Sequence, residues 1–375
     1  MGEERMMILK MLEEGKVSNE EALKLLEALD ESDFSEKSFD TDRKNTIRNN
    51  KENFEEKFEK KIEKVTEDIT ENATDYANNL TDKVLNMVND VVDNGSFLNF
   101  FGNFETITEN IQKDISNLDY PTIDLEGING KITITQWHKN TIDVSATCRI
   151  KKSKVPSEKI YDIYEKDNSI IIKPKFKNNL IANLEVKLPK KNYKLIKINS
   201  TNGKLVIDGL NSENIDCTTS NSSINIENIN SDSIKTKTRN GKIKILKTNA
   251  KNIDIDTSNA SIILDKIMTK DASAKTTNGK IYADGLSFDG NSKLNFKTTN
   301  GKIEVHTNNY VKDNLSVDAK TSLGKIDLSI PNLIYEINDV QNIGSKRILA
   351  YSKDYKDSKG TYIKLSTSNG SIKIC

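Results

Sequence analysis

The side chains of this 375-residue chain that could do chemistry are few and widely separated. Its only imidazole and thiol groups belong to His138, His306, Cys148, Cys217 and Cys375. Neither histidine has a cysteine or a carboxylate nearby at metal-ligand spacing, and no two cysteines have such a spacing. We therefore expect surface histidines and three reduced thiols, with no metal ion and no cofactor.

Motifs that activate water or hold phosphate are missing from the sequence, which has no P-loop, no Gly-x-Ser-x-Gly and no HExxH. Carboxylates are the remaining route to catalysis, because many β-solenoids cut polysaccharides with acids gathered on one face. The acids that could gather in this way are Asp208, Asp254, Asp256, Asp265, Asp284 and Glu304. In a chain that is 30% charged, scattered acids usually serve solubility. We predict no catalytic residue, and a polysaccharide-active enzyme is the alternative.

A repeat in the second half of the chain must position these residues. A six-residue phrase, Thr-Thr-Asn-Gly-Lys-Ile in its fullest form, recurs with its fourth residue at positions 203, 222, 241, 260, 279, 301, 324 and 370. The steps between these positions are 19, 19, 19, 19, 22, 23 and 46 residues. A fixed period near 20 is typical of a solenoid, in which each repeat buries its apolar residues against its neighbours.

The residues around each phrase alternate between apolar and polar, which predicts half-buried β-strands. After the turn, aliphatic residues occupy the second and fourth positions, as in Ile243 and Ile245. Residues 169–172 and 184–186 predict further, less regular strands. We predict a mainly β fold over residues 119–375: a right-handed parallel β-helix with 19–23 residues per coil. An antiparallel meander is the rival, since Asn-Gly is also a strong hairpin signal.

Stacked coils would place the asparagine of each phrase in one row, about 4.8 Å apart, with amides bonded along the axis. This structural ladder comprises Asn202, Asn221, Asn240, Asn259, Asn278 and Asn300. Leu323 takes the asparagine position of a later phrase and should interrupt the row. The residue after the turn alternates between lysine and serine, as in Lys204, Ser223 and Lys242, which would space like charges in a parallel stack.

The first third of the chain has a helical pattern. Residues 1–30 predict a helical hairpin whose second helix begins with a capping box formed by Ser18 and Glu21. Residues 31–50 read as a polar linker. Residues 51–118 predict a long amphipathic helix, at 51–92, followed by an aromatic segment that caps the solenoid. We expect these helices to mediate self-association; packing on the solenoid and binding to a membrane surface are the alternatives.

The formal net charge of the chain is zero, so no overall positive field attracts nucleic acid. The charge is nevertheless distributed unevenly along the sequence. The helix at 51–92 carries a net charge of −5, from 6 lysines and 11 acids. Residues 139–197 carry +9, from 15 basic residues and 6 acids. The basic segment is a solvated face, a docking surface for anionic lipid or wall polymer, or a partner for the acidic helix.

Longer phrases of the sequence carry a family resemblance. "GINGKITI", "LEVKLPKKNYKLIKINSTNGKLVI", the repeated T-[ST]-N-G-K-I and "GTYIKLSTSNGSIKI" resemble the putative-adhesin β-solenoids related to head GIN domains. "ILKMLEEGKVSNEEALKLLEAL" resembles a SHOCT-like hairpin. Together the two parts look like YvlB/LiaX-type proteins, whose family regulates the envelope response of Gram-positive bacteria to membrane-active antibiotics and peptides.

The resemblance implies a non-catalytic, adhesin-like binding or scaffold protein of the envelope-stress response. A purely structural cytoplasmic scaffold is a further alternative. The sequence shows neither a signal peptide pattern nor an apolar run long enough to span a membrane, which predicts a cytoplasmic protein. The resemblance instead implies association with the cell envelope.

Overall fold

The structure is a computed structural model that describes residues 104–151, 154–177, 180–307, 314–340, 344–356 and 360–375. The predicted hairpin at 1–30 with Ser18 and Glu21, the linker at 31–50 and the helix at 51–92 lie outside these residues.

The described part of the chain is built from strands, as the alternating pattern predicted. In chain order they are β1 (Phe104–Asp114), β2 (Thr122–Glu126), β3 (Ile132–Trp137), β4 (Thr141–Lys151), β5 (Tyr161–Lys166), β6 (Ser169–Pro174), β7 (Leu180–Pro189), β8 (Asn192–Asn199), β9 (Leu205–Asp208), β10 (Asn211–Thr218), β11 (Ile224–Glu227), β12 (Asn230–Lys237), β13 (Ile243–Asp256), β14 (Ile262–Lys275), β15 (Ile281–Lys297), β16 (Ile303–Thr307), β17 (Leu315–Thr321), β18 (Ile326–Leu328), β19 (Leu333–Asp339), β20 (Lys346–Ser352), β21 (Thr361–Ser366) and β22 (Ile372–Ile374). The β fold thus begins at Phe104, earlier than the predicted start at residue 119.

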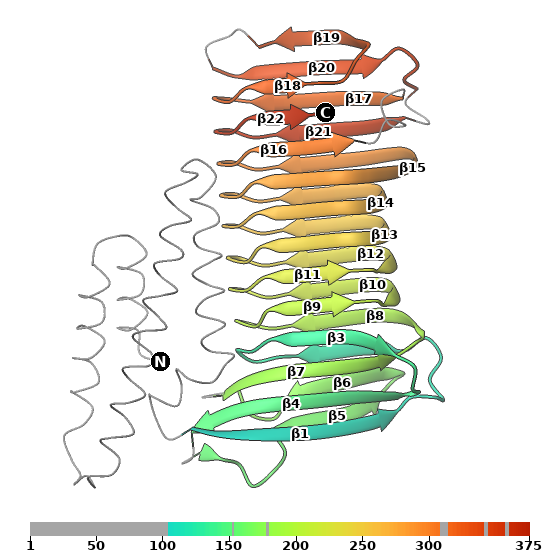
Figure 1. The fold of residues 1–375 in the computed structure, drawn as a ribbon, viewed down its shortest axis with the longest axis vertical. Coiled ribbons are helices and arrows are strands. Elements are labelled where there is room, and N and C mark those ends of the chain that lie inside the picture. The colour runs from blue at the N-terminus through green and yellow to red at the C-terminus, as the bar shows by residue number, and fades with distance from the viewer. Residues whose placement is uncertain (1–103, 152–153, 178–179, 308–313, 341–343, 357–359) are drawn as a thin grey trace, which may run out of the picture. The chain divides into compact units, whose positions relative to one another are not determined.

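Successive coils stack in parallel and form two ladders, which run up the molecule in Figure 1. We call one coil a rung: a strand of the first ladder, the asparagine turn, and a strand of the second ladder. The first ladder joins β8, β10, β12 and the second halves of β13 and β14, each residue pairing with the one 19 positions further on. The second ladder joins β9, β11 and the first halves of the same two long strands. The predicted parallel pairing is therefore confirmed for these rungs, and the predicted right-handedness stays a prediction.

The core is the space between the two ladders. Side chains of each strand alternate between buried and more exposed, so every rung contributes aliphatic residues such as Ile243, Ile245, Ile253 and Ile255, all essentially inaccessible. Each fully buried aliphatic side chain is worth about 1.5–3 kcal/mol relative to its exposed state. A thin stack can thus be stable although only 35% of the chain is hydrophobic.

The far corner of each rung needs a backbone with positive φ. Gly209, Asn228, Lys247, Lys266 and Gly285 follow one another at the 19-residue period, with φ between 45° and 71°. The left-handed region costs a non-glycine residue about 1–2 kcal/mol, so Lys247 and Lys266 store strain that the glycines avoid.

Both ends of the stack depart from parallel pairing, and here the prediction of a parallel solenoid from 119 to 375 is wrong. At the N-terminal end, β7 pairs antiparallel with β4, and β4 with β1, while β5 pairs antiparallel with β6. At the C-terminal end, β20 pairs antiparallel with both β17 and β19. These antiparallel strands cover edges that a parallel stack would leave unpaired.

The order of rungs along the stack also differs from their order along the chain. The strand β2 lies between β6 and β8, and β3 pairs with β7, so β6 and β7 form a rung next to the one formed by β2 and β3. At the other end, β21 lies between β15 and β17, and β22 lies between β16 and β18. The last coil is therefore inserted between two earlier ones, and the C-terminus lies within the stack (Figure 1). The 46-residue step in the repeat corresponds to this insertion.

Candidate functional site

The asparagine row runs along one edge of the stack. Each side-chain Nδ2 donates to Oδ1 of the asparagine on the neighbouring rung, at 2.6–2.8 Å. The order along the row is Asn129, Asn202, Asn221, Asn240, Asn259, Asn278, Asn300 and Asn369. The row is longer at both ends than the six residues taken from the sequence. Because the last coil is inserted, Asn300 is followed by Asn369, and Leu323 lies beyond the row instead of interrupting it.

Buried threonines accompany the row. The hydroxyl of each phrase threonine donates to the fourth-position carbonyl of the rung beside it, for example Thr276 to Ala260 at 2.9 Å and Thr367 to Gly301 at 2.9 Å. Thr321 in turn donates to Gly370 at 2.8 Å, which again places the last coil between two earlier ones. Both rows satisfy polar groups within the stack, so they are structural.

A second asparagine column, which we did not find in the sequence, lies where the first-ladder strands begin. The strand register aligns Asn192, Asn211, Asn230 and Asn249 on successive rungs. The signal was available, because the four residues recur at the same 19-residue period.

Three lysines of the basic segment 139–197 are paired with acids. Lys173 and Lys175 are in ion pairs with Asp124 and Glu158, and Lys177 is in an ion pair with Glu126.

Other lysines of this segment are also engaged. The ammonium of Lys191 donates to the carbonyls of Ile115, Ser116 and Leu118, at 2.7, 3.2 and 2.7 Å. Lys139 and Lys187 lie 5.0 and 5.7 Å from the ring centroid of Trp137. Six of the fifteen basic residues of this segment therefore have partners within the protein.

A different set of lysines does gather on the outward face of the first ladder. The register places Lys275 and Lys297 on adjacent rungs, with Ser366 and then Lys320 following in the same column. Two further lysines lie on these strands, and we call the whole set the lysine surface: Lys275, Lys293, Lys297, Lys320 and Lys364. All of its members are exposed, and within the described ranges none has a carboxylate at ion-pair distance.

Asp256 lies beside Lys275 and Asp271 lies beside Lys293 in the register, although neither pair is at ion-pair distance. Asp318 lies beside Lys364 in the register, but its two carboxylate oxygens accept from Arg347 at 2.9 and 3.0 Å. In the earlier rungs, by contrast, one column of the same face alternates in sign: Asp124, Lys197, Asp216, Lys235 and Asp254.

The acids that might have acted on a polysaccharide are divided between two faces. Asp208, Asp265 and Asp284 belong to the outward positions of the second ladder, and the last two are on adjacent rungs. Asp254 and Asp256 belong to the first ladder. The structure therefore does not gather the six predicted carboxylates at one place.

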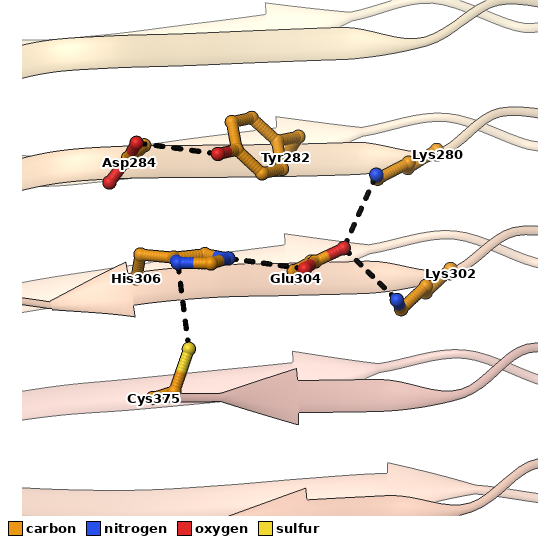
Figure 2. Close-up of polar contacts among 7 residues, drawn as sticks. All are labelled: Lys280, Tyr282, Asp284, Lys302, Glu304, His306 and Cys375. Atoms are coloured by element: carbon orange, nitrogen blue, oxygen red, sulfur yellow. Dashed lines mark hydrogen bonds and ion pairs between the residues drawn. The ribbon is translucent and has the colours of Figure 1, made fainter. Parts of the chain in front are cut away.

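Glu304 is the centre of a polar cluster on the second ladder, shown in Figure 2. Its Oε2 lies 3.2 Å from the Lys280 ammonium and 3.0 Å from that of Lys302, while Oε1 lies 3.1 Å from Nε2 of His306. Partial burial alone would raise the pKa of Glu304, but the hydrogen bonds from Lys302, His306 and Lys280 outweigh it and lower the pKa to about 2. Lys280 and Lys302 break the lysine–serine alternation, and Glu304 compensates their proximity.

The other side of the His306 ring faces a thiol. Nδ1 of His306 lies 3.5 Å from Sγ of Cys375, and the ring of Tyr282 is 5.4 Å away, centroid to centroid. The hydroxyl of Tyr282 donates to Asp284 at 3.3 Å. The sequence analysis found no carboxylate or cysteine near His306 at metal-ligand spacing, but the structure brings one of each to its ring. The carboxylate is two residues away on one face of a strand, and the cysteine is 69 residues away but on the adjacent rung.

A metal ion would need a cluster of side chains that could bind it. Among the residues that the structure describes, no group of three or more histidine, cysteine and acidic side chains could hold a metal ion. Nor does any helix in this part of the chain have the length and apolarity needed to cross a membrane.

Two protein-family models match this chain. The family model Toastrack DUF4097 matches residues 120–375. The chain belongs to the Toastrack DUF4097 family. A SHOCT-like domain model matches residues 3–33, in agreement with the resemblance of the N-terminal hairpin. No curated protein matches this Toastrack chain.

Solved structures similar to this Toastrack chain are distant in sequence. A "putative adhesin" from Parabacteroides merdae is 13% identical with a TM-score of 0.41, over 73% of this chain and 98% of that one. A second "putative adhesin", from Parabacteroides distasonis, is 15% identical with a TM-score of 0.39, over the same shares. A "putative lipid binding protein" from the latter organism is 13% identical with a TM-score of 0.30, again over 73% and 98%. Identities this low say nothing about a shared ligand.

Proposed function

We propose that this protein is a non-catalytic binding protein of the cell-envelope stress response, and that its lysine surface holds a phosphate-bearing envelope polymer. The single observation that carries the proposal is the lysine surface itself: five exposed ammonium groups on adjacent rungs with no carboxylate at ion-pair distance in the described ranges.

Like charges directly opposite each other in a sheet are destabilising, so Lys275 beside Lys297 costs the free protein some stability. An anionic ligand would relieve this repulsion. Neighbouring rungs lie about 4.8 Å apart, so the lysines form a stripe along the stack axis that suits an extended, repeating polyanion. Lysine binds phosphate as a point charge, without the fixed geometry of arginine, which fits a polymer with flexible linkages.

The test is the binding of a soluble polyglycerol phosphate, the chemistry of teichoic acids, measured by calorimetry at low and high salt. We expect binding at low salt that weakens steeply as salt rises, because the attraction is screened. The double variant Lys275→Gln/Lys297→Gln should weaken it at least tenfold. Lys197→Gln/Lys235→Gln is the matched control on the same face, where neighbouring aspartates already balance the lysines, and it should bind like the wild type.

Absence of binding at low salt would refute the polymer as ligand. Binding to anionic vesicles but not to the soluble polymer would refute it too, and would identify a lipid headgroup as the ligand. Equal binding to a DNA duplex of matched charge would show a surface without preference for envelope polymers.

The role in envelope stress rests on the resemblance to YvlB/LiaX-type proteins, with self-association through the N-terminal helices as part of the proposal. Cell fractionation with and without an envelope-active antibiotic tests the location. We expect the protein in the envelope fraction after treatment, and a protein that stays in the cytosolic fraction under both conditions would support the purely structural scaffold.

A further inference from the structure

One cysteine differs from the other two in its surroundings. Cys148 and Cys217 are fully buried in the core. Burial raises the pKa of the Cys148 thiol to about 12, and it also raises the pKa of Cys217. Such thiols are inert, because the thiolate is the nucleophile. Cys375 is only half-buried and lies on the outward side of the second ladder, against the ring of His306.

The charge of Glu304 decides which nitrogen of His306 carries the proton. The carboxylate is ionised at neutral pH and is only 14% exposed, so it can accept hydrogen bonds but cannot donate one. Nε2 of His306, at 3.1 Å, must therefore be the donor. In the neutral ring the lone pair then belongs to Nδ1, which is the nitrogen that faces Sγ of Cys375.

The alignment is held on both sides of the ring. Lys280 and Lys302 hold the far oxygen of Glu304, and Tyr282 packs beside the imidazole at an interplanar angle of 53°. The backbone N–H of Cys375 donates to the carbonyl of Val305 at 3.0 Å, which fixes the cysteine beside the histidine. This row of carboxylate, imidazole and thiol, seen in Figure 2, exists only because the last coil is inserted next to β16.

We propose that Cys375 is a reactive thiol that forms a mixed disulfide with a small disulfide, with His306 as its base and Glu304 as a positioning residue. The proton of Sγ passes to Nδ1 of His306. The thiolate attacks one sulfur of the incoming disulfide, a new bond forms to Sγ, and the old S–S bond breaks. The departing thiolate takes the proton from the imidazolium. Cys375 is thereby oxidised and half of the disulfide is reduced, so no other oxidant is needed.

Three lysines and three acids lie on the rungs around the thiol. Lys280, Lys302 and Lys373 come from the three rungs at this place, and Lys373 is aligned with Glu304 in the register. The acids that face the same area are Glu304, already bonded to two of these cations, Asp284, which accepts from Tyr282, and Asp327, which is aligned with Lys373. Stoichiometric modification at this site, not turnover, would make the protein responsive to oxidised thiols independently of what the lysine surface binds.

The test is the reaction of the folded full-length chain with dithiobis(nitrobenzoate), an anionic aromatic disulfide, followed by the release of nitrothiobenzoate. We expect one fast equivalent per chain at neutral pH, lost in Cys375→Ser, with the other two thiols reacting only after denaturation. His306→Ala should slow the reaction about tenfold and shift the midpoint of its pH–rate profile upward, because the base that accepts the thiol proton is lost. Glu304→Gln should shift the midpoint in the same direction by less.

His138→Ala is the control, because it removes the other histidine, which is exposed and lies directly after β3. This variant should leave the reaction rate and the midpoint of the pH–rate profile unchanged. Unequal folding among variants is checked by circular dichroism. Two results would each overturn the proposal: a wild-type rate and pH midpoint equal to those of His306→Ala, or a fast equivalent that survives in Cys375→Ser.

Discussion

The central rungs and the C-terminal rungs contain the same six-residue phrase, but they differ in whether their order along the stack follows their order along the chain. From β8 to the first half of β15, each rung stacks on the one before it in the chain, at a period of 19 residues. Beyond β16 the chain first builds the rung of β17 and β18, and only then returns with β21 and β22 to fill the place between.

The comparison shows that the phrase specifies the structure of one rung but does not specify which rung stacks against it. The side chains next to the turns fit the observed order of rungs. With the last coil inserted, Ser371 separates Lys302 from Lys325, which continues the lysine–serine alternation, and Asn369 continues the asparagine row beyond Asn300. Stacking in chain order would have put Lys302 directly beside Lys325 and Leu323 beside Asn300.

The largest effect is expected from deleting residues 361–375. Four fully buried side chains, Ile363, Leu365, Ile372 and Ile374, leave the core, each worth about 1.5–3 kcal/mol. Because this coil lies inside the stack, the strands β17 to β20 should lose amide-exchange protection while residues 211–265 keep it. Retained protection in β17 to β20 would mean that the last coil is a terminal cap.

A smaller difference should separate two isoleucines at the same phrase position. Ile243 is fully buried in a central rung, and Ile243→Ala should cost about 2–5 kcal/mol of unfolding free energy. Ile326, in the outermost rung of the second ladder, is only partly buried, and Ile326→Ala should cost about 1 kcal/mol. Denaturant unfolding measures both; equal costs would show that the outer rung is as well covered as the central ones.

Glu304 should make the junction between the two regions sensitive to acid. Its pKa falls from 4.5 to about 2 in the folded protein, so its stabilising contribution is present above pH 4.5 and is lost as the pH falls towards 2. The difference in unfolding free energy between wild type and Glu304→Gln should therefore shrink over this window, by on the order of 2 kcal/mol. A difference that stays constant between pH 6 and about pH 2.5, which is well below the unfolded pKa of a glutamate, would contradict the assignment.

The smallest effects belong to the corner positions of the regular rungs. Lys266→Gly should stabilise the protein by about 0.5–1 kcal/mol, because the φ of 55° no longer strains a side chain. Gly209→Ala, at the equivalent corner, should destabilise it by about 1 kcal/mol, although nothing lies within 4 Å of the new methyl group. Thermal unfolding measures both, and changes of the same sign would refute a conformational origin.

Much of the regular stack was predictable from the sequence, since alternation fixes which residues face inward and the period fixes the register. Ile243 with Ile262 and Asn240 with Asn259 are examples of neighbours implied by the period alone. The SHOCT-like match was predicted from a long phrase of the sequence, whereas the Toastrack family was not named, although the phrases of the repeat indicated a β-solenoid.

The ends and the thiol cluster were not predictable by the same means. The antiparallel pairs of β4 with β7 and β17 with β20 follow no repeat. The repeat period also does not predict that residues 361–374 insert between the rung of β15 and β16 and the rung of β17 and β18. The contact of Cys375 with His306 depends on that return, so a search for nearby partners along the chain missed it. The lysine surface was missed for a related reason, since its members come from four strands whose neighbours had to be known first.

The most direct test of the out-of-order stack is disulfide cross-linking in a Cys375→Ser background. Adjacent parallel rungs place equivalent Cα atoms about 4.8 Å apart, within the roughly 4.4–6.8 Å that a disulfide spans, whereas rungs two apart lie at about 9.6 Å. Asn300→Cys paired with Asn369→Cys should therefore oxidise readily to an intramolecular disulfide, and Asn300→Cys paired with Leu323→Cys should not. The reverse outcome would show that the rungs stack in chain order and would contradict the structure described above.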